Sequence, residues 1–258
     1  MNWDHSDSEE ESTVPDDEER VSFLRKLVNK MESEADHRIH KQFNLLYGIT
    51  SGLGVLLIVL MLTWILHYRN GFSVTVANQE FYWHPMLMVL GLIFLYAQSI
   101  LTYRIARHAK KKVLKLTHAL LHCLAFILSV LSLKAVFDSH NYSEPPIPNL
   151  YSLHSGFLTF LFPGLSKNLR ACYLPFHTYF GATIFTMVIV TAMLGLAEKA
   201  IWAVPNYSSM GGEAVLVNFI GVILLSFGLL VLYLVYNPTY KRVALAEDDI
   251  TLVGRVEN

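Results

Sequence analysis

Five long apolar runs constrain the fold of this chain more than any other feature of its sequence. They cover roughly residues 45–66, 85–103, 116–137, 176–196 and 214–236. A bilayer core about 30 Å thick needs about 20 apolar residues in a helix, so each run is long enough to cross. Hydrophobic residues make up 53% of the chain and charged residues 16%, against about 25% charged residues in soluble domains. We therefore predict an all-α, polytopic membrane helix bundle.

A shorter apolar run lies between the third and fourth long runs. It covers residues 151–162, follows a proline-rich loop at 141–149, and ends at Pro163 and Gly164. Its 12 residues make about 18 Å of helix, well short of a bilayer core. The sequence thus predicts five clear spans and one segment too short to cross as a regular helix.

Lysine and arginine gather on one side of the expected bundle. Six of them lie between the second and third runs, and three pairs flank the first, fourth and last runs. They are Arg104, Arg107, Lys110, Lys111, Lys112 and Lys115, with Arg38, Lys41, Lys167, Arg170, Lys241 and Arg242. The loops expected opposite, at residues 67–84, 138–150 and 197–213, hold few basic residues. Because basic loops remain in the cytosol, we expect both termini to be cytosolic.

Two Asn-x-Ser sequons fall on the opposite side, at Asn141 and Asn206. Such sequons are glycosylated only in a lumenal or extracellular location, so they agree with the orientation predicted from charge. We expect glycosylation at both sites. We expect a multi-pass protein of the plasma membrane or of an endosomal, lysosomal or secretory-vesicle membrane, and no residue pattern selects one of these.

The two ends of the chain differ in composition from its middle. Residues 1–41 contain an acidic stretch and no long apolar run, which predicts a mostly disordered cytosolic tail with room for a short helix around residues 21–31. Residues 42–242 form the predicted membrane domain, and residues 243–258 a second cytosolic tail. The formal net charge of −1 by itself indicates nothing about partners. We expect no nucleic-acid partner for a membrane bundle of this kind.

Four histidines lie near the ends of apolar runs, where an ionisable residue is costly and commonly functional. His84 opens the second run, His118 the third, His154 the short run and His177 the fourth. With the direction of the spans taken from charge, His84 and His154 share the outer level and His118 and His177 the inner level. His122 lies four residues after His118 on the same helix face, so spacing alone does not choose between them.

Two pairs of imidazoles at two depths predict two b-type haems with histidine on both axial positions. Oxygen then finds no open iron site, and such a centre serves electron transfer. No set of cysteine or carboxylate ligands in the helices favours zinc or a di-iron site. A histidine-lined metal transporter without haem is an alternative, and the scarcity of carboxylates inside the spans argues against it.

The residues around these histidines are distinctive as a set. The chain reads FYWHPMLMVLGLIF around His84, KLTHALLHCLAF around His118, AVFDSHN at residues 135–141, LYSLHS around His154, LPFHTYFGA around His177, and GLLVLY at residues 228–233. Together these motifs, spread over roughly residues 45–242, resemble the cytochrome b561 family. The resemblance is closest to its animal ascorbate-dependent ferric and monodehydroascorbate reductases, including the duodenal and lysosomal types.

This resemblance implies six helices, of which the middle four bind two b haems, and commonly a homodimer. It also implies single-electron transfer from cytosolic ascorbate to monodehydroascorbate or a ferric chelate on the other side of the membrane. The implied haem ligands form the pairs His84 with His154 and His118 with His177. His122 is not among them.

The resemblance further implies two substrate sites. On the cytosolic side, basic residues of the family bind ascorbate, and the matching positions are Lys111, Lys115 and Arg170. On the outer side, the positions that match contacts to ascorbate or a metal are His140, Asn149 and Tyr151. Cations beside an anionic enediol favour both its binding and its deprotonation.

The chain departs from the family at the short run. Relatives have a full span after the LYSLHS motif, whereas here LYSLHS is followed directly by GFLTFLFPG. If the segment does not cross, the last two helices invert their direction. Either way the haem of His84 and His154 is the one at risk, and we expect it to be weakened or lost. The alternative function is a non-conducting isoform that regulates or competes with a full-length partner.

Overall fold

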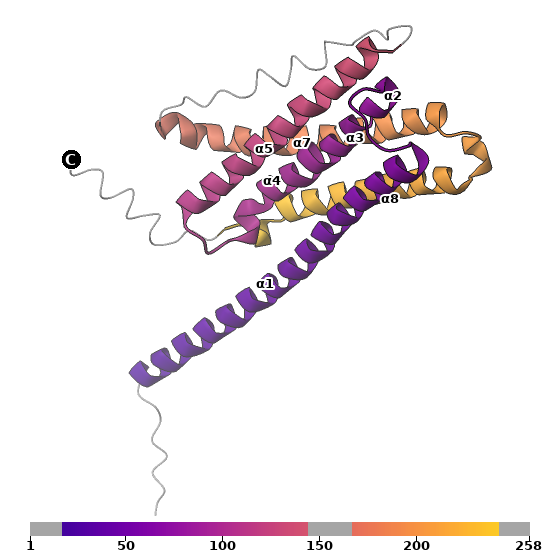
Figure 1. Cartoon of the computed structure of the whole chain (residues 1–258). Helices are drawn as coiled ribbons and strands as arrows, with labels where there is room; N and C mark the ends of the chain where they lie inside the picture. The colour runs from indigo at the N-terminus through magenta and orange to yellow at the C-terminus, as the bar shows by residue number, and fades with distance from the viewer. Residues whose placement is uncertain (1–16, 144–166, 243–258) are drawn as a thin grey trace, which may run out of the picture. The chain divides into compact units, whose positions relative to one another are not determined.

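The computed structural model describes residues 17–143 and 167–242, and every regular element in these two ranges is a helix (Figure 1). The α-helices and the 3-10 and π segments (η) are α1 Asp17–Thr63, η1 Trp64–Tyr68, α2 Ala77–Glu80, α3 Trp83–Met88, η2 Val89–Leu95, α4 Tyr96–Ile105, α5 Lys111–Asn141, α7 Lys167–Ala203, η3 Tyr207–Ser209, α8 Gly212–Tyr236 and η4 Pro238–Tyr240. The all-α prediction is confirmed.

Five helical stretches of the described chain are long and apolar enough to cross a membrane. They are Asp17–Tyr68, Ala77–Ile105, Lys111–Asn141, Pro175–Ala203 and Gly212–Tyr236. Each contains one of the five expected runs, so the polytopic helical bundle is confirmed. The short run at residues 151–162 lies outside the described residues.

The helices extend further than the apolar runs do. The third one continues to Asn141, so His140 and Asn141, expected in a loop, belong to the last turn of α5. At the N-terminus α1 begins at Asp17, and the short helix expected around residues 21–31 falls inside it. No glycine or proline interrupts residues 17–42, which explains why the helix continues through this polar stretch.

The described part of the chain divides into two units, one before Phe43 and one from Phe43 onward. In the first unit, six large apolar side chains of the described helix are exposed: Val21, Phe23, Leu24, Leu27, Val28 and Met31. The second unit contains the helical bundle, and all the structural features discussed below belong to it.

The second span packs along α5 over its whole length. The span consists of α3, η2 and α4 in sequence, and the middle part is a π-helix (Figure 1). The two backbones approach closely at Gly91, where an added Cβ would lie 3.0 Å from the Leu128 Cβ and 3.2 Å from the Ala125 carbonyl oxygen. Small residues at such crossings are how membrane helices gain van der Waals contact.

The helix contacts fix the direction of each span. Ser139 near the end of α5 donates to the carbonyl of Ala77 in α2 at 2.7 Å, so α5 is antiparallel to the second span. Lys199 near the end of α7 lies 4.0 Å from the centre of the Phe81 ring, beside α2. The helices α5 and α7 therefore run in the same direction. The inverted arrangement expected for a segment that fails to cross is not the one found.

Two ends of the bundle can now be defined. The Arg69 end holds the end of η1, the start of the second span, the C-termini of α5 and α7, and the start of α8. The His118 end holds the C-terminus of α4, the N-termini of α5 and α7, and the end of α8. The chain leaves α5 at the Arg69 end and enters α7 at the His118 end, and residues 144–166 between them lie outside the described part.

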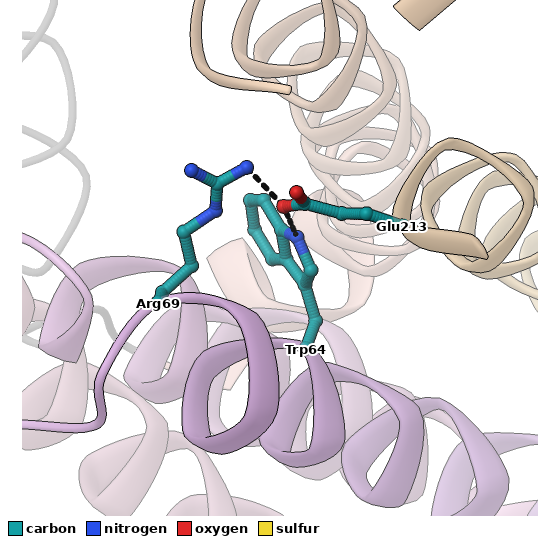
Figure 2. Close-up of polar contacts among 3 residues, drawn as sticks. All are labelled: Trp64, Arg69 and Glu213. Atoms are coloured by element: carbon teal, nitrogen blue, oxygen red, sulfur yellow. Dashed lines mark hydrogen bonds and ion pairs between the residues drawn. The ribbon is translucent and has the colours of Figure 1, made fainter. Parts of the chain in front are cut away.

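A charged cluster joins the first and last spans at the Arg69 end (Figure 2). One carboxylate oxygen of Glu213, in the first turn of α8, accepts from the Trp64 indole at 2.8 Å and from the Arg69 guanidinium. The Arg69 guanidinium also lies 5.5 Å from the centre of the Trp64 ring. The side chains of Arg69 and Glu213 are only 13% and 12% exposed, so each charge depends on the other for compensation.

Arg104 plays a matching part at the His118 end. Its guanidinium donates to the carbonyl of Asn237 at 2.7 Å and to that of Val235, just past and at the end of α8. These carbonyls have no partner within the helix, and a cation there also complements the helix dipole. The last span is thus held at both ends by arginines from other segments.

We predict that Glu213→Gln strongly destabilises the folded chain. The amide can still accept from Trp64, but Arg69 keeps a mostly buried charge without its counter-ion, which costs about 3 kcal/mol. The thermal midpoint of the purified protein in detergent measures the effect. The matched control is Glu198→Gln, at an exposed carboxylate near the end of α7, and it should stay within about 0.5 kcal/mol of the wild type. Equal midpoints for the two variants would contradict the buried ion pair.

Candidate functional site

Three histidines come together at the His118 end. The ring centres of His118 and His122, one turn apart on α5, are 4.5 Å apart, and the ring of His177 on α7 lies 6.0 Å from that of His118. Two metal–nitrogen bonds of about 2 Å, with ~1 Å from each nitrogen to its ring centre, place two axial imidazoles ~6 Å apart. The spacing of His118 and His177 therefore fits a metal held between the two rings.

His118 is held in one orientation by Ser99 of α4. The His118 Nδ1 lies 2.9 Å from the Ser99 carbonyl oxygen and 3.1 Å from its hydroxyl, while that hydroxyl donates to the His118 carbonyl at 2.9 Å. A carbonyl only accepts, so it selects the tautomer with a proton on Nδ1. The Nε2 lone pair is then available for a metal, which is the usual arrangement of a ligating histidine.

His84 shows the same arrangement toward the Arg69 end. It lies on α3, and its Nδ1 is 2.9 Å from the hydroxyl of Ser132 on α5. That hydroxyl also lies 3.2 Å from the His84 carbonyl oxygen and donates to it. The expected partner of His84 is His154, which lies outside the described residues, so this second pair stays a prediction.

The basic residues expected to bind ascorbate lie at the His118 end. Lys111 and Lys115 are exposed on the first two turns of α5, and Arg170 belongs to the first turns of α7. Lys111 precedes His118 by seven residues, and Arg170 precedes His177 by seven, which is two turns or about 10 Å of helix. The side chain of Arg170 lies outside the described part. Two helix N-termini add to the positive potential at this end.

A cavity of about 410 Å³ opens at the Arg69 end. His140, from the last turn of α5, lines this cavity, and its role at an outer substrate site stays a prediction. Its other polar lining residues include Arg69, Lys199, Gln79, Asn78, Ser139 and Tyr82. The sequence analysis did not single out Lys199, although a charged residue near the end of an apolar run is a recognisable signal. Asn149 and Tyr151 lie outside the described residues.

Both sequon asparagines are also found at the Arg69 end. Asn141 is the exposed last residue of α5, and the exposed Asn206 lies between α7 and α8 with a left-handed backbone (φ 48°). Their shared end agrees with the orientation expected from charge, and glycosylation itself stays a prediction. Among the described residues, no group of three or more histidine, cysteine and acidic side chains is placed to hold a metal ion directly.

Ser99 and Ser132 are the site residues that the sequence analysis missed. Ser99 follows His84 by 15 residues and Ser132 follows His118 by 14, so each helix carries a histidine near one end and a serine near the other. This matching spacing is the signal that was available. The spacing places each serine beside the histidine of the other helix only because the two spans are antiparallel, which the sequence alone does not show.

Comparisons with known proteins identify the family of the chain. The family model for eukaryotic cytochrome b561 matches residues 83–156 and 155–203, in two pieces that meet where the sequence analysis expected a shortened span. The plasma membrane ascorbate-dependent reductase of Xenopus tropicalis is 40% identical over 210 residues, which are 74% of this chain and 74% of the relative.

Two further relatives cover similar or larger parts of the chain. The transmembrane ascorbate-dependent reductase of Mus musculus is 38% identical over 214 residues, 76% of this chain and 84% of its own. A Caenorhabditis elegans homologue of these reductases is 33% identical over 235 residues, 81% of this chain and 88% of its own. On this evidence the chain belongs to the eukaryotic cytochrome b561 family.

Proposed function

We propose that this chain is a transmembrane oxidoreductase that passes electrons from cytosolic ascorbate to an acceptor on the opposite side of the membrane. The observation that carries the proposal is the His118–His177 pair. It combines a ring spacing suited to one metal, a fixed tautomer and a basic surface two turns away. The names of the relatives, all ascorbate-dependent reductases, support the same reaction.

His118 and His177 would hold one b haem, and His84 and His154 the second. Haem with two histidine ligands gains and loses single electrons without opening a site to oxygen. The protein's own contribution would be to present the Nε2 atoms of His118 and His84 without a proton, because the Nδ1–H of each ring donates to a serine oxygen on the neighbouring helix. His122 packs its ring against that of Tyr96 and would not bind the haem iron.

The donor site would lie at the His118 end. Lys111 and Lys115 share one face of α5, and Arg170 occupies the corresponding position before His177 on α7. Ascorbate is an anion at neutral pH, so these cations and the two helix N-termini concentrate it near the ligand helices. Their positive field also favours loss of the second enediol proton, which makes ascorbate a better one-electron donor.

The acceptor site would be the cavity at the Arg69 end. Monodehydroascorbate and ferric chelates of organic acids are both anionic, and the Lys199 ammonium group gives the cavity wall a positive charge. His140 offers an imidazole for a hydrogen bond to the acceptor or for a contact with its metal. With the His118 end in the cytosol, this cavity and both sequons face the lumen or the cell exterior.

The short run supports a second candidate function. The family-model match breaks at residues 155–156, directly after His154. A shortened span there would displace His154 from its family position, and we expect the haem of His84 and His154 to be held less tightly than that of His118 and His177. A chain that lost it would bind ascorbate without conducting electrons, and would act as a regulator or competitor of a full-length partner.

We predict that His118→Ala removes one ascorbate-reducible haem, whereas His122→Ala keeps it. The reason is that the ring of His118, held by Ser99, is the one spaced to share a metal with His177. A reduced-minus-oxidised absorbance spectrum of the purified full chain, with ascorbate as reductant and haem counted per chain, measures this. If only His122→Ala lost the haem, the ligand would be His122 and not His118. A wild-type chain without haem would refute the proposed function.

We predict that Lys115→Ala raises the KM for ascorbate about 5–10-fold, because it removes about 1 kcal/mol of charge attraction near the donor. The matched control is Lys241→Ala, which removes the same charge from an exposed residue at the same end of the bundle, directly after η4. The initial rate of haem reduction at a series of ascorbate concentrations gives both values. Equal effects of the two variants would mean that only the general positive potential matters.

A further inference from the structure

Two fully buried serines link the second span to α5 at the proposed haem ligands. Ser99 and Ser132 are both 0% exposed. A buried hydroxyl costs free energy unless its hydrogen bonds are made, so its partners are informative. In both cases the partners belong to one histidine on the neighbouring helix.

Each serine contacts its histidine at two points. The hydroxyl of Ser132 donates to the His84 carbonyl at 3.2 Å and accepts from the His84 Nδ1 at 2.9 Å. The hydroxyl of Ser99 donates to the His118 carbonyl at 2.9 Å, and the Nδ1 of that ring lies 3.1 Å from it. A hydroxyl has one proton to donate. When that proton is donated to the backbone carbonyl, the hydroxyl oxygen can only accept from the ring N–H.

The two contacts are reciprocal, although the spacings differ by one residue. From His84 to Ser99 is 15 residues, and from His118 to Ser132 is 14. The extra residue falls in the span that contains the π-helix η2, Val89–Leu95. A π turn holds more residues than an α turn, so it absorbs the extra residue and lets both serines meet their histidines.

We propose that Ser99 and Ser132 are positioning residues for the two haem ligands, His118 and His84. This inference rests on the proposed function, because it requires haem at those histidines. The hydroxyl of each serine helps to fix the rotation of an imidazole about its own axis. The proton is kept on Nδ1 by the Ser132 hydroxyl at His84, and by the Ser99 carbonyl together with the Ser99 hydroxyl at His118. A hydrogen bond from Nδ1–H also makes the ring a more basic ligand, which stabilises ferric over ferrous iron and lowers the midpoint potential.

The two serines differ in what remains when the hydroxyl is removed. His118 retains the Ser99 carbonyl as an acceptor, 2.9 Å from its Nδ1, whatever side chain stands at position 99. Ser132 contacts the His84 ring through the hydroxyl itself. We therefore expect Ser99→Ala to weaken haem retention about 10-fold, at the low end of the range for lost partners of metal ligands, and Ser132→Ala to weaken it more.

The test uses the full chain purified with its haem, as the wild type and as Ser99→Ala, Ser132→Ala and Ser129→Ala. Ser129 is the matched control, because it is 2% exposed on α5 and bonds only within its own helix, to the Ala125 carbonyl at 2.7 Å. The measurements are haem per chain, the rate of haem transfer to excess apomyoglobin, the midpoint potential of each haem, and its electron paramagnetic resonance spectrum.

We expect Ser99→Ala to shift the potential of the His118 haem to a more positive value, to alter its resonance spectrum, and to speed haem release about 10-fold. Ser132→Ala should do the same to the His84 haem, and Ser129→Ala should change neither. Ser99→Thr, which keeps the hydroxyl, should restore the wild-type potential. If the wild type holds only the His118 haem, Ser132→Ala must leave that haem unchanged while Ser99→Ala shifts it.

The inference is overturned if Ser99→Ala leaves the potential and the spectrum of the His118 haem as they are, or if Ser129→Ala shifts them equally. Those results would leave the proposed function intact, because the wild type would still hold ascorbate-reducible haem. A wild type without haem would overturn both, and the haem count of the wild type alone distinguishes the two failures.

Discussion

The bundle depends on one constraint, which is that a polar ring inside a membrane span must be hydrogen-bonded across to another helix. His118 meets this requirement through Ser99 and His84 through Ser132, at opposite ends of the same antiparallel helix pair. The bonds fix the register of the second span against α5, and Gly91 permits the close backbone approach that this register needs. Because each bond occupies Nδ1, the opposite nitrogen of each ring is left for a metal.

The remaining polar groups divide by the end of the bundle at which they lie, and this division gives the molecule its direction. At the His118 end, the N-termini of α5 and α7 carry Lys111, Lys115 and Arg170 two turns or less from the histidine pair. At the Arg69 end, the ion pair with Glu213 holds the first and last spans together beside a basic cavity. A donor and an acceptor that are both anionic would therefore each meet a positive surface, on opposite sides of the same bundle.

The sequence predicts the parts of this architecture that depend on local pattern. Apolar runs locate the spans, and basic residues predict which end of each span is cytosolic. Because successive spans alternate in direction across the membrane, His118 and His177 are predicted at the same depth. The Arg69–Glu213 pair was not predictable, because it joins residues 144 positions apart through packing. The two serines were missed for a related reason: a serine inside a span is unremarkable until the helix register is known, and the π-helix shifts that register by a residue. The N-terminal extension of α1 to Asp17 was not predicted. The acidic composition of residues 1–41 led to the expectation of a disordered tail, although residues 17–42 contain no glycine or proline to break a helix.

The central claim is that this chain conducts electrons across a membrane despite its short fourth segment. The most direct test reconstitutes the full chain into vesicles loaded with ascorbate and follows reduction of a membrane-impermeant ferric chelate added outside. The account predicts steady external reduction that depends on internal ascorbate, is absent from protein-free vesicles, and is lost in His177→Ala. Haem that internal ascorbate reduces while the external chelate stays ferric would contradict the account, and would identify the chain as a non-conducting member of its family.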